Sequence, residues 1–224
     1  MNDLRLIRDQ KIIQFDNDQN FKKDDFYISN CNKHIVKLIN NWPKWEKNFL
    51  NINGDRCSGK SHLINIFLKK FKGIKFEANS FINENLKEIK IHQNIVLENL
   101  TKDIDEKLIY SLFNIIDQDN KYLIITTTEP IAEIQFNLKD LKSRAKNFLL
   151  QNIKKPDDDL IFALILKNLS DRQISLEKKL INYIIKRIDR SYGKIFDFIY
   201  KIDEMSLKKK KSIDLKIIKE VLGE

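Results

Sequence analysis

The feature that most constrains this chain is an octapeptide with the phosphate-binding pattern G-x-x-x-x-G-K-[ST]. It comprises Gly54, Asp55, Arg56, Cys57, Ser58, Gly59, Lys60 and Ser61. Residues 49–52 before it form an apolar-leaning run typical of a buried strand, and residues 63–71 after it have the apolar spacing of a helix. Because strand, loop and helix follow in the order that a P-loop requires, the sequence predicts an α/β protein that binds a nucleotide.

The residue types of this loop suit phosphate chemistry. Gly54 and Gly59 permit backbone conformations that a Cβ would block, so successive N–H groups can surround phosphate oxygens at the positive end of a helix dipole. We expect Lys60 to reach the β and γ phosphates and the Ser61 hydroxyl to hold Mg²⁺, with His62 also at the nucleotide. The alternative is an ordinary glycine turn before a helix.

Composition indicates a globular protein. A length of 224 residues with 42% hydrophobic content suffices for one α/β core and a smaller second domain. No apolar stretch approaches the roughly 20 residues of a membrane span, and residues 1–10 lack a signal-peptide core, so we expect a cytoplasmic protein without membrane insertion. Cys31 and Cys57 match no metal-ligand spacing and are expected to be reduced thiols.

The net charge of +9 would suit a nucleic-acid partner. However, arginine is scarce while lysine, isoleucine and asparagine are abundant, which is typical of an A/T-rich genome. We therefore do not infer a phosphate-reading surface from the charge. The lysine run at 208–211 is expected to be a solvated loop between two helices.

Hydrophobic periodicity divides the chain into three parts. Residues 1–25 form a polar tail, and residues 26–155 alternate strands with helices, which predicts a parallel sheet covered on both faces. Residues 156–224 show only helical spacing, with breaks at Pro156, Ser175 and residues 191–193. The expected strands are 49–52, 74–78, 93–98, 122–127 and 147–153, and the expected helices are 32–41, 63–71, 105–117, 160–169, 176–188, 194–205 and 214–222.

Two strand ends are candidates for the rest of the nucleotide site. Glu98 ends an apolar strand and is expected to serve Mg²⁺, whereas Asn99 follows at the place of a second acid and cannot accept a proton. Slow or absent self-catalysed hydrolysis is therefore expected. Thr128 ends another strand and could contact the γ-phosphate or the attacking water. The alternatives are a surface glutamate for Glu98 and simple β-propensity before a turn for the threonine.

Several motifs together resemble a known family. They are the Trp42-Pro43-x-Trp45 turn, the P-loop, and residues 95–99, 141–144 and 153–157. They are similar to the AAA+ module of the bacterial replication initiator DnaA and, more closely, to the DnaA-related Hda group in its alphaproteobacterial form. The resemblance implies an AAA+ fold with a five-stranded parallel sheet, flanking helices and a small helical lid. DnaA would continue past the position of Glu224 into a DNA-binding domain, so we expect DNA contact to be mainly indirect.

The resemblance also implies residue roles in the nucleotide site. Arg144 corresponds to an arginine finger that acts in trans on a neighbour's nucleotide, and Phe26, Tyr27 and Ile28 would wall the adenine of ADP or ATP. The position of the family's lid sensor arginine holds Phe196, which leaves Lys194 as a nearby cation. On residues alone, Arg144 is more typical of a surface side chain than of an arginine finger.

The first 25 residues contain a glutamine followed by spaced apolar residues. The resemblance implies a peptide that binds the DNA polymerase sliding clamp, with Gln10 in one subsite and Ile13 and Phe15 in a hydrophobic pocket. The alternative is a hydrophobic anchor that packs on its own domain.

The function implied by the resemblance is negative regulation of replication initiation. Bound to nucleotide and tethered to the clamp, the chain would present Arg144 to ATP on DnaA and stimulate its hydrolysis, with at most weak ATPase activity of its own. The alternatives are a self-acting AAA+ ATPase such as a DnaC-type helicase loader, and a nucleotide-stabilised scaffold. The sequence leaves open whether the chain forms homo-oligomers.

Overall fold

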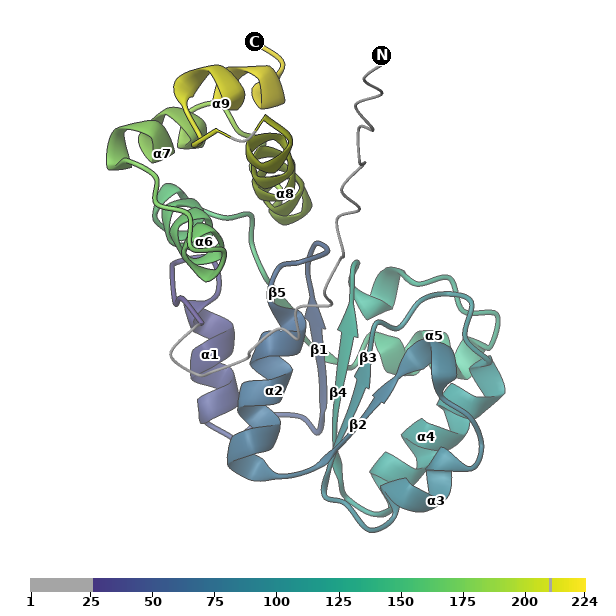
Figure 1. The fold of residues 1–224 in the computed structure, drawn as a ribbon. Helices are drawn as coiled ribbons and strands as arrows, with labels where there is room; N and C mark the ends of the chain where they lie inside the picture. The colour runs from purple at the N-terminus through teal and green to yellow at the C-terminus, as the bar shows by residue number, and fades with distance from the viewer. Residues whose placement is uncertain (1–25, 210) are drawn as a thin grey trace, which may run out of the picture.

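The computed structural model describes residues 26–209 and 211–224. Five parallel strands form one sheet in the order β2-β3-β4-β1-β5 (Figure 1). The strands are β1 (Phe49–Asn53), β2 (Ile74–Glu77), β3 (Asn94–Glu98), β4 (Tyr122–Thr127) and β5 (Leu149–Asn152). The predicted five-stranded parallel sheet is confirmed, and each strand lies within a few residues of its predicted range.

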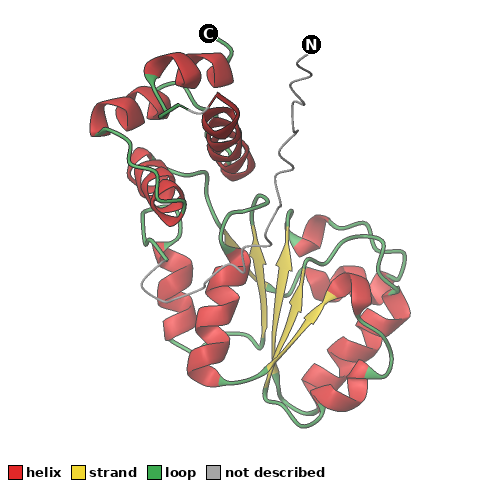
Figure 2. Cartoon of the chain, viewed as in Figure 1, coloured by secondary structure: helices red, strands yellow, loops and turns green. Residues whose placement is uncertain are grey.

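Helices cover both faces of the sheet (Figure 2). On one face lie α1 (Lys33–Asn40) and α2 (Lys60–Phe71), and on the other lie α3 (Asn85–Ile89), α4 (Glu106–Gln118) and α5 (Lys139–Ala145). Two short 3₁₀ turns occur at Ala78–Ser80 and Ile131–Glu133. This arrangement confirms the predicted layers.

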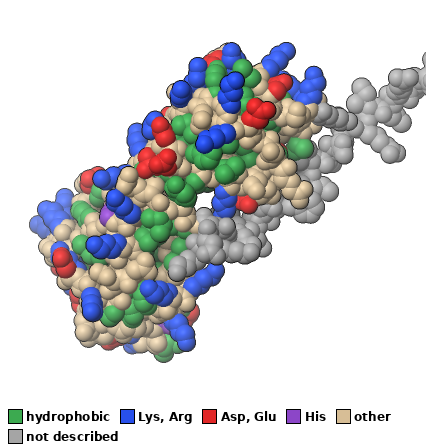
Figure 3. Space-filling model, turned by 90° about the vertical axis from the view of Figure 1, so that its left-hand side faces the viewer, with side chains coloured by type: hydrophobic (Ala, Val, Ile, Leu, Met, Phe, Trp, Pro, Cys, Tyr) green, Lys and Arg blue, Asp and Glu red, His purple; other side chains and the backbone are tan. Residues whose placement is uncertain are grey.

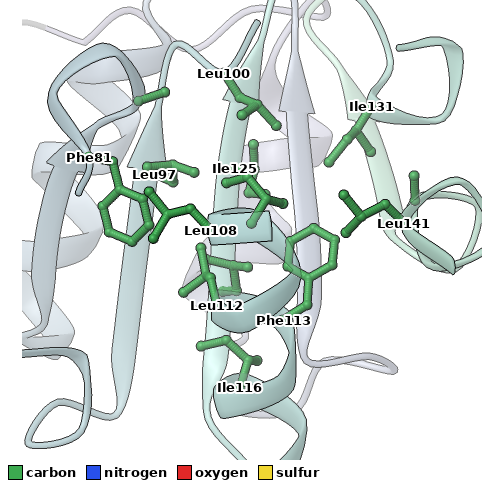
Figure 4. Close-up of a cluster of buried hydrophobic side chains, with 14 of the residues drawn as sticks. Phe81, Leu97, Leu100, Leu108, Leu112, Phe113, Ile116, Ile125, Ile131 and Leu141 are labelled. Atoms are coloured by element: carbon green, nitrogen blue, oxygen red, sulfur yellow. The ribbon is translucent and has the colours of Figure 1, made fainter. Parts of the chain in front are cut away.

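Alternating side chains of the strands fill two separate apolar cores. On β3, Ile95 and Leu97 belong to the cluster beneath α4, whereas Val96 belongs to the cluster beneath α1 and α2. Because side chains alternate along a strand, the next residue on the α2 side is Glu98. Figure 4 shows the core on the α4 side, where Leu112 and Phe113 lie against the sheet.

The C-terminal helices form a separate layer with its own core. They are α6 (Asp158–Asp171), α7 (Lys178–Ile185), α8 (Tyr192–Lys209) and α9 (Leu215–Leu222). Asp157 and Asp214 cap two of these helices by accepting hydrogen bonds from Leu160 N and Ile217 N, both at 2.9 Å. These helices have their own buried cluster, which includes Ile165, Ile184 and Phe198. The predicted helical region after the sheet is confirmed.

Two local predictions in this region are wrong. The break predicted at residues 191–193 lies earlier, because Tyr192 is buried and begins α8. The lysine run does not begin in a loop, since Lys208 and Lys209 form the last turn of α8. Their ammonium groups are held by Glu204 and Glu220, at 2.7 and 2.5 Å. Tertiary packing and ion pairs therefore extend this helix in both directions.

The turn between α1 and β1 packs through its aromatic residues. The Trp42–Pro43 peptide bond is cis. Trp42 and Trp45 both contact Phe67 of α2 and Tyr122 at the start of β4. The two tryptophans thus fix the C-terminal half of α2 against the sheet.

Residues 153–157 connect β5 to α6, and we refer to them as the connector. Ile153 N donates to Asn53 O at 2.8 Å, directly before the phosphate loop. The Tyr192 hydroxyl of α8 donates to Lys154 O at 3.0 Å, and the Cys31 sulfur lies 2.9 Å from Lys155 O. The connector is therefore bound to the sheet, to the lid and to the N-terminal segment.

Charged side chains are distributed widely over the surface. Lys and Arg side chains occur from the sheet domain to the lid on the face shown in Figure 3. Within residues 26–209 and 211–224, no helix combines the length and apolar character that crossing a bilayer requires.

Candidate nucleotide-binding site

The predicted phosphate loop lies between the end of β1 and the start of α2. Gly54 N donates to Thr127 O at 3.2 Å, and Ser58 N donates to Asp55 O at 3.2 Å, so the loop is closed on itself and on β4. Helix α2 begins at Lys60 without a side-chain cap. The first N–H groups of a helix have no intrahelical partner, so they are available to an anion.

The two glycines of the loop are required by its geometry. A Cβ on Gly54 would lie 3.0 Å from both Ile153 Cβ and Ser58 Oγ. Gly59 has a φ of 90°, and a Cβ there would lie 3.2 Å from the ring of Phe26. Both positions are therefore too crowded or too strained for an ordinary side chain.

Lys60 is buried at the centre of the loop. Its Nζ donates to the carbonyl oxygens of Gly54 at 2.7 Å and Asp55 at 2.9 Å. Burial lowers the pKa of this ammonium group, and the charges of Asp55, Cys57 and Glu98 oppose that effect. The ammonium group thus lies inside the loop and within electrostatic range of Glu98.

Several buried polar atoms of the site have no hydrogen-bond partner within the described chain. The Ser58 hydroxyl is one of them, and both carboxylate oxygens of Glu98 are others. Buried polar groups are normally hydrogen-bonded, so such atoms fit a site that receives ligand atoms. Ser61, half-buried in the first turn of α2, adds a hydroxyl on the same loop.

Glu98 lies at the end of β3 and is fully buried, so the alternative of a surface glutamate is wrong. Its Oε2 lies 2.9 Å from Lys75 Nζ as an ion pair, without the alignment of a hydrogen bond. A carboxylate and a hydroxyl are ligands that suit Mg²⁺, so Glu98 and Ser61 fit that ion. Among the residues described, no group of three or more His, Cys, Asp or Glu side chains could hold a metal.

Asn99 adopts a left-handed conformation directly after β3, with a φ of 58°. Its backbone N–H donates to Thr126 Oγ1, and its side-chain amide donates to Glu77 Oε2, both at 2.9 Å. Asparagine is one of the few residues that favours this conformation, so the turn itself explains its presence.

The threonines at the end of β4 have different surroundings. Thr126 accepts from the backbone of Asn99, and Thr127 accepts from Asn51 Nδ2 at 2.9 Å, so both hydroxyls serve the fold. Thr128 is exposed at the end of the strand. Its predicted contact with the nucleotide stays a prediction.

Asn51 is a residue that sequence analysis missed. It is fully buried in β1, and its amide donates to Ile125 O at 3.1 Å as well as to Thr127. Its Oδ1 accepts from Ile131 N at 2.9 Å. Asn51 therefore fixes both ends of the short segment that carries Thr128. A polar residue within an apolar strand was the signal that could have identified it.

The N-terminal segment lies beside the phosphate loop. Phe26 contacts the His62 ring edge to face, with 5.1 Å between the ring centres, and it also covers Gly59. Tyr27 and Ile28 are exposed and line a pocket of about 260 Å³ together with Lys33 and Asp157. The structure thus brings these predicted adenine-wall residues between the loop and the start of the lid.

Arg144 lies in the last turn of α5, on the α4 side of the sheet. Its guanidinium group pairs with Asp140 at 2.9 Å and with Asp117 at 3.1 Å. It also lies 5.4 Å from the centre of the Tyr110 ring. The sheet therefore separates this arginine from the α2 face, where its own chain's Glu98 lies.

The remaining predicted residues lie near the start of α8 or outside the described part of the chain, and their roles stay predictions. Lys194 is exposed in the first turn of α8, and Phe196 is half-buried nearby. Arg190 pairs with Asp158 at 2.6 Å. Gln10, Ile13 and Phe15 lie outside the described residues, so the clamp-binding peptide stays a prediction.

Comparison with known proteins finds similarity to the Hda lid and to DnaA. Residues 157–222 match a family described as "Hda, lid domain". DnaA of Thermoanaerobacter pseudethanolicus is 26% identical over 90% of this chain, and DnaA of Borreliella afzelii is 24% identical over 74%. The chain covers 51% and 39% of these two proteins, and thus spans about half the length or less of the curated relatives that it matches.

Solved structures with the same fold include a replication initiation protein and a Holliday-junction branch-migration motor. Domain III of Thermotoga maritima DnaA superimposes with a TM-score of 0.70 at 17% identity, over 92% of this chain and 96% of that one. The RuvB branch-migration motor of the same organism superimposes with a TM-score of 0.69 at 12% identity, over 90% of this chain and 71% of that one. The fold is therefore that of an AAA+ module.

Proposed function

We propose that this chain, which is similar to DnaA over most of its length and to the Hda lid over residues 157–222, is a nucleotide-bound negative regulator of replication initiation. It binds ADP or ATP at the phosphate loop and docks on the DNA polymerase sliding clamp through Gln10, Ile13 and Phe15. It then presents Arg144 to ATP held by the initiator DnaA and stimulates hydrolysis of that ATP. Contact with DNA is mainly through the clamp.

The observation that carries this proposal is the match of residues 157–222 to the Hda lid. The position of Arg144 supports it, because α5, which carries this arginine, lies on the opposite face of the sheet from α2, the helix that follows the chain's own phosphate loop. A planar guanidinium group can stabilise the charge of a phosphoryl-transfer transition state when a second protein supplies it.

In this proposal the chain's own nucleotide is a bound ligand that is turned over slowly. Lys60 and the free N–H groups of α2 bind its phosphates, while Phe26, Tyr27 and Ile28 contact the base. Ser61 and Glu98 hold Mg²⁺, which neutralises phosphate charge. The amide of Asn99 cannot accept a proton from water, so the site lacks a general base at that position.

The test is the hydrolysis of ATP prebound to DnaA, measured with this protein, DNA and loaded clamp. We expect Arg144→Ala to reduce the stimulation by at least about tenfold, since arginine fingers contribute about 10³ or more to phosphoryl transfer. Gln10→Ala should also reduce the stimulation, because it removes a contact with the clamp that tethers the chain. Arg172→Ala is the matched control, because Arg172 forms a comparable ion pair with Asp203 at 3.0 Å within the lid. Absence of stimulation by the folded wild-type protein would contradict the proposal.

One observation favours a second candidate function, a self-acting ATPase such as a helicase loader. The carboxylate of Glu77 is exposed and accepts a hydrogen bond from the side-chain amide of Asn99. A carboxylate therefore lies beside Asn99, the position where an ATPase is expected to carry its second acid. Intrinsic ATP turnover by the isolated chain distinguishes the two functions. Turnover that is rapid and lost in Glu77→Gln supports the ATPase, whereas slow turnover that is unaffected by this change supports the adaptor.

A further inference from the structure

The pairing of β2 with β3 places a lysine against the carboxylate expected at the metal. Lys75 and Glu77 of β2 are opposite Val96 and Glu98 of β3. Lys75 Nζ lies 2.9 Å from Glu98 Oε2 and 3.4 Å from Asn65 Oδ1 on α2. The lysine side chain is 35% exposed and the glutamate side chain 1% exposed. The ammonium group therefore reaches from the solvent-facing edge of the sheet into the α2 side of the site.

Glu98 needs this cation in the absence of a metal. A buried carboxylate is costly unless a charge or hydrogen bonds compensate it, and neither Glu98 oxygen accepts a hydrogen bond from the part of the chain that the structure describes. The amide of Asn99 is directed to Glu77 instead, and Lys60 is held by two loop carbonyls. Among residues 26–209 and 211–224, Lys75 is thus the cation paired with the Glu98 carboxylate.

We propose that Lys75 determines how strongly nucleotide binding depends on a divalent cation. Its ammonium group competes with hydrated Mg²⁺ for Glu98, and it neutralises Glu98 when no metal is present. The chain therefore binds a nucleoside diphosphate with little dependence on Mg²⁺. This inference rests on the proposed nucleotide binding at the loop.

A variant without the Lys75 ammonium group should bind nucleotide less well in the absence of a metal. Removal of Lys75 leaves Glu98 as an unpaired negative charge on the face where the phosphates bind, so binding without metal weakens. Mg²⁺ then restores nucleotide binding, because it replaces the missing positive charge beside Glu98. The quantity of interest is the Kd in EDTA divided by the Kd in Mg²⁺, since losses of overall stability cancel in this ratio.

The experiment is a titration of the purified chain with fluorescent N-methylanthraniloyl ADP, in excess Mg²⁺ and in EDTA. For the wild type we expect a ratio within about threefold of one, and for Lys75→Met a ratio roughly tenfold higher, as for a partly buried ion pair of modest strength. Lys75→Arg should keep the wild-type ratio. Lys87→Met, which removes an exposed lysine on the nearby helix α3, is the charge-matched control and should also keep it.

A second arm separates this role from a purely structural one. In a Glu98→Gln background, Lys75→Met should not change the ratio, because the carboxylate for which lysine and metal compete is gone. If Lys75→Met does not fold, Lys75→Gln replaces it at this partly exposed position.

A variant that binds more weakly but keeps the wild-type ratio would overturn this inference and leave the proposed function intact. Failure of the wild type to bind the nucleotide with or without Mg²⁺ would overturn both.

Discussion

At the residue scale, the site depends on backbone conformations that few side chains tolerate. Cys57, Gly59 and Asn99 have φ angles of 63°, 90° and 58°, all in the left-handed region. They lie in the phosphate loop and directly after Glu98. The loop and the adjacent turn are therefore shaped by the backbone before any side chain contacts a ligand.

The two left-handed glycines provide a matched pair of substitutions. Gly59→Ala should lower the free energy of unfolding by about 2 kcal/mol and weaken nucleotide binding, because it adds a contact with Phe26 to the backbone strain. Gly223→Ala has a similar φ of 82°, but apart from its chain neighbours no described residue lies within 4 Å of the new Cβ, so only the strain of about 1 kcal/mol remains. Urea denaturation and nucleotide titration measure both effects. Equal losses in the two variants would contradict the role of Phe26.

The buried amide of Asn51 leads to a second prediction at this scale. Asn51→Ala removes three hydrogen bonds and leaves the buried Ile131 N–H without a partner, which should cost about 2 to 3 kcal/mol of unfolding free energy. Asn48→Ala, which removes one surface bond to Asn120, should cost less than about 1 kcal/mol. Chemical denaturation of both variants provides the comparison, and similar losses would argue against a central role for Asn51.

The sequence identified some of these residues and missed others for a physical reason. The phosphate loop is a continuous segment, so its glycines and lysine form a local pattern that the chain displays directly. The contacts of Asn51 and Lys75 join strands that are distant in sequence, and they depend on which strands become neighbours. No local pattern contains that information.

At the element scale, α4 and α5 form a unit that fixes Arg144. Glu106 in the first turn of α4 accepts hydrogen bonds from Asn137 N at 2.6 Å and Leu138 N at 2.7 Å, directly before α5. At the other end of α5, Arg144 pairs with Asp117 of α4. Helix α5 is therefore bound to α4 at both ends.

Glu106 should make this unit sensitive to acid. The hydrogen bonds from Asn137 N and then Leu138 N lower the pKa of this carboxyl from its ordinary value of 4.5. Its contribution to stability is therefore complete above pH 4.5 and is lost as the pH falls through the lowered folded-state pKa. Glu106→Gln should lower the Tm at neutral pH, and this difference from the wild type should shrink towards acid.

Thermal unfolding between pH 3 and pH 7 measures this difference. Glu133→Gln, at an exposed acid near α5, is the control and should not show the trend. A Tm difference for Glu106→Gln that stays constant with pH would contradict the assignment.

Hydrophobic periodicity was sufficient for the five strands and for seven of the helices, and less so for their ends, whereas the short helices α3 and α5 had no predicted range. The four lid helices follow from apolar spacing, yet α8 begins at Tyr192 within a predicted break. Tyr192 is buried because its ring packs with the core beneath α1 and α2 and its hydroxyl bonds to the connector. A helix end that depends on a neighbouring domain cannot be predicted from the helix's own residues.

At the scale of the whole molecule, the connector joins the sheet domain to the lid, and Leu160 and Tyr192 of the lid also pack with the core beneath α1 and α2. Burial, with the nearby Cys31 and Asp157, raises the pKa of the Tyr192 phenol well above its usual value, so it stays a donor to Lys154 O. Cys31 lies 3.4 Å from Asp157, the cap of α6, which also ties the N-terminal segment to the lid.

Loss of the Tyr192 hydroxyl should loosen the lid without unfolding it. Tyr192→Phe removes one hydrogen bond to the connector, worth about 1 kcal/mol, and should speed amide hydrogen exchange in α6 and α8 roughly fivefold. Tyr183→Phe is the matched control, since its hydroxyl bonds to Glu224 within the lid. Exchange in the sheet domain should stay unchanged in both variants. Equal effects of the two substitutions on the lid would contradict the prediction.

The close packing of Gly54 against Ile153 has a consequence for signal transmission. The first residue of the phosphate loop and the first residue of the connector are in contact, and Asn53 and Ile153 share a backbone hydrogen bond. The contacts from the phosphate loop to the lid therefore pass through two connector residues, Ile153 beside Gly54 and Lys154, whose carbonyl oxygen accepts from Tyr192 of α8. A displacement of the loop on phosphate binding should therefore move the connector and the start of α8 together.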